Sequence, residues 1–194
     1  MIKRNYKEKI LNYKIPTGNT IEDFKLTPSL DKLLTNLDNG ISTCMETARQ
    51  SGRTLTSLLY ASEILINEED PIICIYAMNI TSGLRLRYKL KHVLRINHSN
   101  LTEIAIEHII SNNVMINPSK QFIKRNKNKI KFIIYDDLLS WSNIMRSINL
   151  LNAKNILSVS SGSDPKYLIQ RTGFKYFDHV KFSYHEDAKN FIRN

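Results

Sequence analysis

A short polar turn at residues 48–54 has the composition of a phosphate-binding loop: Ala-Arg-Gln-Ser-Gly-Arg-Thr. Gly52 permits a tight backbone, Arg53 supplies positive charge for a phosphate, and Thr54 offers a hydroxyl to Mg²⁺. The turn departs twice from the standard GxxxxGK(S/T) pattern, because Thr47 stands at the first glycine and Arg53 at the lysine. It predicts a phosphate site, with an ordinary helix start as the alternative.

A pair of carboxylates follows a strongly apolar run further along the chain. Phe132-Ile133-Ile134-Tyr135 leads directly into Asp136 and Asp137. In phosphoryl-transfer sites, one such acid acts through the metal ion and a second orients or deprotonates the attacking water. The pattern alone has low specificity, since many strands end in an aspartate.

Both motifs need a scaffold that brings them together, and the hydrophobic pattern predicts an α/β layered domain. Apolar runs alternate with segments of helical spacing, and the runs are apolar on both faces, which is typical of a mostly parallel sheet covered by helices. In such sheets, ligands bind beyond the carboxyl ends of the strands. Strands are predicted at 41–47, 71–78, 131–135 and 155–161, with a final strand or hairpin at 174–184. Helices are predicted at 26–37, from about 54 to 66, at 101–109 after a cap at Ser99 or Asn100, and at 141–151.

Taken in order, these segments resemble the ATPase domain of large terminase subunits of tailed phages. The stretch from Ala48 to Thr54 is similar to the family's ATP-binding loop, in which the first glycine is commonly lost and Arg-Gln precedes Gly-Lys-Thr. Residues 158–162, Ser-Val-Ser-Ser-Gly, resemble its coupling motif. The resemblance covers roughly residues 25–185. It implies a P-loop NTPase fold with an additional strand between the phosphate-loop strand and the acidic-motif strand.

The resemblance also implies a role for individual residues. Arg49 and Asp137 would be catalytic, and Ser160 and Ser161 would belong to the coupling motif. Thr54 and Asp136 would hold Mg²⁺. The nucleotide would be bound by residues of the turn: Gln50, Ser51, Gly52, Arg53 and Thr54.

Several positions depart from the family pattern and bear on activity. Arginine is planar and bulkier than lysine, so Arg53 is not a conservative replacement. Asp137 is one methylene shorter than the family's glutamate, which displaces a general base by about 1 Å. The segment 26–30 lacks the aromatic and glutamine pair that usually holds adenine. The expected organisation is a basic segment at 1–24 and one ATPase-like domain at 25–194, without a nuclease domain. ATP and Mg²⁺ are the implied ligands, either retained or lost.

Three hypotheses about function follow. In the first, a catalytically weakened homologue docks on the terminase, the portal or double-stranded DNA and modulates or blocks packaging. In the second, the chain is an active Mg²⁺-ATPase of a packaging motor. The third is an N-acyltransferase-like, DNA-modifying fold, suggested by the segment from Tyr167 to Tyr184. Strand order distinguishes the folds, because the P-loop fold places the strand at 155–161 between those at 41–47 and 130–136.

Charge and composition restrict the partners. The 194 residues carry 28 Lys and Arg against 18 Asp and Glu, a net charge of +10, which favours a polyanionic partner such as DNA. Basic clusters at 85–95 and 120–131 are either DNA-contacting or solvated faces. Cys44 and Cys74 sit in apolar runs and are predicted to be reduced core thiols. With no apolar stretch long enough to span a bilayer, we expect a cytoplasmic protein of an infected cell.

Overall fold

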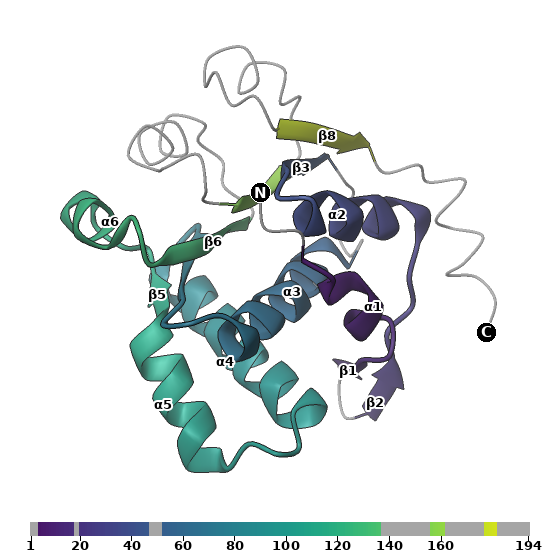
Figure 1. Ribbon diagram of the computed structural model, residues 1–194, viewed down its shortest axis with the longest axis horizontal. Helices are drawn as coiled ribbons and strands as arrows, with labels where there is room; N and C mark the ends of the chain where they lie inside the picture. Colours follow the sequence, from purple (N-terminus) through teal and green to yellow (C-terminus); the bar gives the residue numbers. More distant parts are fainter. Residues whose placement is uncertain (1–3, 18–19, 47–51, 137–155, 162–176, 182–194) are drawn as a thin grey trace.

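The computed structural model describes residues 4–17, 20–46, 52–136, 156–161 and 177–181 (Figure 1). Its strands are β1 (Lys14–Thr17), β2 (Thr20–Asp23), β3 (Ser42–Glu46), β4 (Ile72–Ala77), β5 (Val114–Ile116), β6 (Ile130–Asp136), β7 (Ile156–Ser161) and β8 (Phe177–Lys181). Its helices are α1 (Tyr6–Ile10), α2 (Pro28–Asp38), α3 (Arg53–Asn67), α4 (Ile80–Asn97), α5 (Glu103–Asn113) and α6 (Lys120–Asn126).

Six strands form one parallel sheet in the order β5-β4-β6-β7-β3-β8. β7 therefore lies between β3 and β6, which confirms the predicted strand order and the α/β fold class. The order is the one that the P-loop hypothesis predicts, so it favours that hypothesis over the N-acyltransferase-like fold. Of the predicted run at 174–184, the structure describes residues 177–181, which form β8 and pair with β3.

Three helices lie side by side on one face of the sheet. α3 contacts both α2 and α4, while α2 contacts β3, α3 contacts β6 and α4 contacts β4 (Figure 1). β4 and β6 are buried on both faces, as their continuous apolar runs predict. Cys44 and Cys74 are buried thiols outside any disulfide, and burial raises the pKa of the Cys74 thiol to about 12. Both therefore serve as small core side chains.

The sequence pattern missed one long helix and misplaced one cap. α4 spans 18 residues, although only its basic cluster was recognised from the sequence. The spacing of its buried residues, including Leu86, Leu90 and Val93, is helical, but interspersed arginines and lysines weaken the contrast between its faces. α5 is capped by Thr102, whose side chain accepts from the Ala105 N–H, and not by Ser99 or Asn100.

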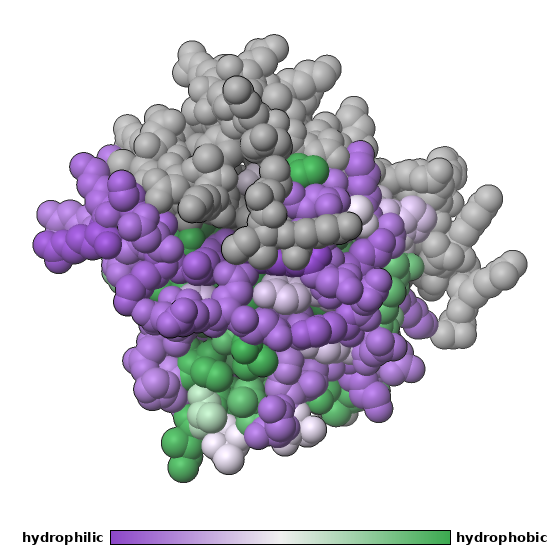
Figure 2. All heavy atoms as spheres, in the orientation of Figure 1, coloured by the Kyte–Doolittle hydropathy of each residue, from purple (hydrophilic) through white to green (hydrophobic). Residues whose placement is uncertain are grey.

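The visible surface of the described residues is mainly hydrophilic, with apolar side chains gathered in a smaller area over α4 and α5 (Figure 2). Among the helices that the structure describes, none combines the length and hydrophobicity needed to cross a bilayer.

Gly83 allows α4 to approach β5 closely. A Cβ atom built at Gly83 would lie 2.3 Å from Cγ2 of Ile116. We expect Gly83→Val to lower the free energy of unfolding by about 2 kcal/mol, because β-branched bulk forces the helix and strand apart. Urea unfolding measures this. Thr81→Val, at an exposed position of the same helix, is the control and is expected to change stability by less than about 0.5 kcal/mol. Equal effects of the two changes would contradict the steric account.

The N-terminal segment packs against the helical layer through a buried polar cluster around Glu63. This side chain is 1% exposed and accepts a hydrogen bond from the Tyr13 hydroxyl. The Asn67 amide donates to it at 3.1 Å, and the Lys9 ammonium lies 3.2 Å away. Tyr13 also contacts His98, with 3.1 Å between its hydroxyl and Nε2. The cluster thereby joins the segment around α1 and β1 to both α3 and α4.

His98 makes the free energy of unfolding fall at acidic pH. Burial, with a smaller effect of Lys9, lowers the pKa of His98 below its ordinary 6.5, while burial raises the pKa of the facing Glu63 carboxyl. As pH falls below 6.5, the unfolded chain protonates His98 while the folded chain keeps it neutral, so stability is lost. Glu63 opposes this trend, because its raised pKa makes the folded chain bind a proton more tightly than the unfolded chain.

A comparison of variants isolates the histidine. Between about pH 7.5 and pH 5.5, the free energy of unfolding is expected to fall less in His98→Gln than in the wild type, because the variant has no imidazole to protonate. His108→Gln, at an exposed position, should follow the wild type. Parallel pH profiles for the wild type and His98→Gln would contradict the assignment.

Candidate functional site

The site is built on the N-terminus of α3, which begins after Gly52. Gly52 has φ +77°, a left-handed conformation that glycine adopts without strain. A Cβ here would meet Leu30 Cδ1 at 3.4 Å, an ordinary contact, so the backbone angle is what requires glycine. α2, α4, α5 and α6 are each capped by a side chain, whereas Gly52 has none to offer α3. The first N–H groups of α3 are therefore suited to an external anion.

Arg53 brings a positive charge to this helix end. The residue is 9% exposed, and its carbonyl accepts from the Ser57 hydroxyl at 3.1 Å. The first turn of α3 contains no acidic residue. A cation at a helix N-terminus opposes the helix dipole, and a bound anion would offset this cost. The arrangement therefore favours a phosphate ligand.

The central contact joins the two motifs. The Thr54 hydroxyl donates to a carboxylate oxygen of Asp136 at 2.5 Å, across 82 positions of sequence. Thr54 lies in the first turn of α3, and Asp136 is the last residue of β6. Both side chains are half-buried. The fold thus places a hydroxyl and a carboxylate together at the carboxyl edge of the sheet, where ligands of α/β proteins bind.

The same edge receives the end of β7. Ser160 is in register with Met45 and Ser161 with Glu46, so the predicted coupling residues lie beside the strand that enters the phosphate turn. The other predicted site residues fall outside the described part of the chain: Arg49, Gln50, Ser51 and Asp137.

Thr54 and Asp136 form an oxygen donor set, which is the kind that Mg²⁺ prefers. Mg²⁺ commonly keeps several waters and takes only one or two protein ligands beside substrate phosphates, so two side chains suffice. Across the described residues, no group of three or more His, Cys, Asp or Glu side chains could hold a metal ion. The donor set fits Mg²⁺ bound together with a nucleotide better than a metal held by protein side chains alone.

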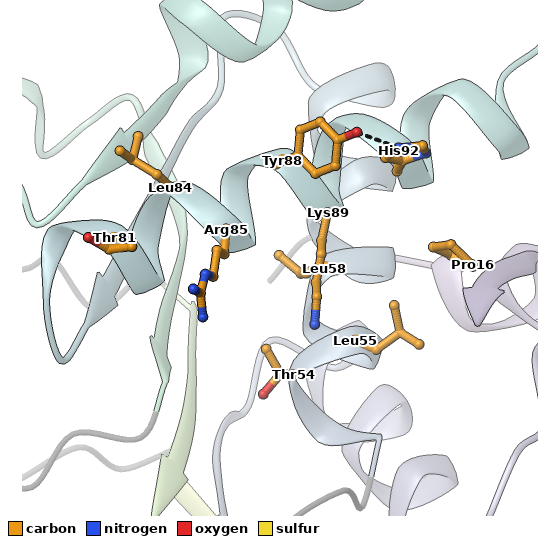
Figure 3. A pocket seen from close by; sticks show the side chains of 10 residues that line it. All are labelled: Pro16, Thr54, Leu55, Leu58, Thr81, Leu84, Arg85, Tyr88, Lys89 and His92. Atoms are coloured by element: carbon orange, nitrogen blue, oxygen red, sulfur yellow. Dashed lines mark hydrogen bonds between the residues drawn. The ribbon is translucent and has the colours of Figure 1, made fainter. Parts of the chain in front are cut away.

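A groove adjoins this site. It has a volume of about 740 Å³ and lies between α3 and α4, with Pro16 of β1 at its border (Figure 3). Thr54 lines it together with Thr81, Arg85 and Lys89 of α4. The sequence revealed these basic residues but not their place near Thr54. Their helical spacing, together with their position just after a strand end, is the signal that could have indicated it.

Comparisons with known proteins identify the fold. No protein-family model matches the chain, and no curated protein matches it. Similar solved structures include the UvsW helicase of bacteriophage T4, with a TM-score of 0.64 and 17% identity over 91% of this chain and 66% of that one. A DEAD box protein of Methanococcus jannaschii has a TM-score of 0.60 and 13% identity, covering 82% of this chain and 50% of that one. The DEAD-box helicase Mss116, bound to single-stranded RNA and UDP-BeF, has a TM-score of 0.55 and 13% identity, covering 81% and 40%.

These likenesses show the fold and place the chain in a structural class. The protein has the helicase-like, RecA-like fold of P-loop NTPases. This confirms the P-loop NTPase fold that the sequence predicted, whereas the three structures named above are two helicases and a DEAD box protein. The chain spans between 40% and 66% of the length of these three structures.

Proposed function

We propose that this chain binds Mg²⁺-ATP at the turn before α3. The observation that carries the proposal is the 2.5 Å hydrogen bond between Thr54 and Asp136. These two groups would share the Mg²⁺ ion, while Arg53 and N–H groups at the α3 N-terminus would bind phosphate oxygens. Bound Mg²⁺ would neutralise phosphate charge.

For the reaction itself, Arg49 would stabilise the transferring phosphate and Asp137 would orient water. Ser160 and Ser161, at the end of β7, would sense the phosphate state from beside β3. The replacement of the family's lysine by Arg53, and of its glutamate by Asp137, supports a domain that binds nucleotide and turns it over slowly.

We further propose that the protein acts on viral DNA packaging as a weakened terminase-like domain that modulates or blocks the motor. The order of the phosphate turn, the strand ending in Asp136 and the strand ending in Ser161 supports this reading. Basic side chains on α6 supply positive charge for DNA phosphates, including Lys120 and Lys124. The partner is the terminase, the portal or the DNA itself.

An active nucleic-acid-dependent ATPase is the second candidate. It is favoured by the likeness to helicase domains, one of which was solved with single-stranded RNA and a nucleotide analogue. In this case the chain would drive movement along nucleic acid.

Two measurements separate these functions. The first is DNA-stimulated phosphate release by the wild type, Asp136→Ala and Arg53→Ala. Release that both changes abolish would support the active ATPase. The second is DNA packaging in vitro with the purified protein added. Mg²⁺-ATP binding without release, together with reduced packaging, would support the weakened homologue. A protein that neither binds Mg²⁺-ATP nor alters packaging would contradict both.

A further inference from the structure

The groove between α3 and α4 has an aliphatic floor. Leu55 and the buried Leu58 of α3 line it together with Leu84 of α4, and Pro16 borders it (Figure 3). Leu84 is 50% exposed although it lies beside this floor. An apolar groove of this kind leaves surface in contact with water that another chain could cover.

An exposed apolar stripe continues the floor along α4. Ile80, Leu84 and Tyr88 are spaced four residues apart, so they lie on one side of the helix. They are 65%, 50% and 60% exposed. Such a stripe is the complement of the apolar face of an amphipathic helix.

The basic residues of α4 differ between its two sides. On the side facing α5, Lys91 lies 2.9 Å from Glu103, and Arg95 lies 2.5 Å from the same carboxylate. On the groove side, Arg85 and Lys89 are exposed and have no ion-pair partner among the described residues. Figure 3 shows both side chains reaching from α4 toward the end of α3 where Thr54 lies. The described lining of the groove contains no acidic residue, so its charge is complementary to an acidic partner.

We propose that this groove binds an acidic amphipathic helix of a partner protein. Its apolar side chains would pack on the partly exposed Leu55 and on Leu84, and its carboxylates would pair with Arg85 and Lys89. The aliphatic floor favours a protein over a single-stranded nucleic acid, because bases stack on aromatic rings. The one tyrosine in the lining, Tyr88, packs edge-on against His92 and shares a 3.0 Å hydrogen bond with it. The proposal deepens the proposed function by naming the chemistry of a protein partner.

The test is a fluorescence anisotropy titration of the full chain, without nucleotide, so that failure of ATP binding would not affect it. The probes are a labelled amphipathic peptide of leucine and glutamate, the same peptide with lysine in place of glutamate, and a scrambled leucine–glutamate peptide. We expect the first peptide to bind at least about tenfold more tightly than the other two. The double variant Arg85→Glu/Lys89→Glu should reverse the preference between glutamate and lysine.

Two further variants complete the test. Leu84→Asn removes an apolar contact at an exposed position and should weaken binding of the leucine–glutamate peptide by about tenfold. Lys25→Glu/Lys32→Glu, at exposed positions outside the groove lining, reverses the same amount of charge elsewhere and should leave binding unchanged. Equal affinity for all three peptides, or no loss in the Arg85/Lys89 variant, would overturn the proposal. So would tighter binding of a single-stranded oligonucleotide, or self-association of the chain, that the Arg85/Lys89 variant abolishes.

Discussion

Replacing Asp136 with alanine is expected to weaken Mg²⁺-dependent ATP binding about 100-fold. The side chain supplies a carboxylate at the contact between α3 and β6, and the Thr54 hydroxyl donates to it at 2.5 Å. Without it, Mg²⁺ would lose its anionic protein ligand and Thr54 its orienting partner. Titration of a fluorescent ATP analogue, with Mg²⁺ and with a chelator, measures the effect.

Variants of the hydroxyl refine this prediction. Thr54→Val keeps the shape but removes the oxygen, and should cost about tenfold in the presence of Mg²⁺, whereas Thr54→Ser should bind as the wild type does. Asp23→Ala, at an exposed position of β2, is the control for loss of a carboxylate elsewhere. Affinity that is equal in the wild type and Asp136→Ala, or that is independent of Mg²⁺, would rule out the proposed metal site.

Replacing Glu63 with alanine is expected to lower the free energy of unfolding by about 3 kcal/mol. The carboxylate is 1% exposed and is contacted by Tyr13, Asn67 and Lys9. Its removal leaves the Tyr13 hydroxyl with a lost acceptor and opens a cavity between α3 and the N-terminal segment. Urea unfolding at neutral pH measures the loss.

Two matched variants separate the cluster from general effects of substitution. Glu63→Gln keeps the volume and an oxygen acceptor and should cost about 1 kcal/mol. Glu69→Ala, at an exposed position near the end of the same helix, should cost less than about 0.5 kcal/mol. If Glu63→Ala were no more destabilising than Glu69→Ala, the polar cluster would not stabilise the packing of the N-terminal segment.

The sequence was sufficient for the fold class and for the pairing of the two site motifs. The apolar runs at 72–77 and 130–136 are intrinsically strand-forming, and the chain alternates them with helical segments. Once a parallel sheet is predicted, the ends of its strands must share one edge, so Asp136 and the turn before Thr54 are brought near each other by topology alone. Gly52, Thr54 and Asp136 can be recognised as candidate site residues from the linear sequence, because each stands in a short local motif.

Only the tertiary structure decided what lies around that site. The contact of Tyr13 with Glu63 and His98 joins residues 50 and 85 positions apart, and no local propensity specifies such a partner. Likewise, the sequence shows a basic cluster at 85–95, but which cations are neutralised depends on how α5 packs beside α4. Backbone propensity and hydrophobic period act over a few residues, whereas the faces that meet are chosen by packing of the whole domain. The groove beside Thr54 is a product of that packing.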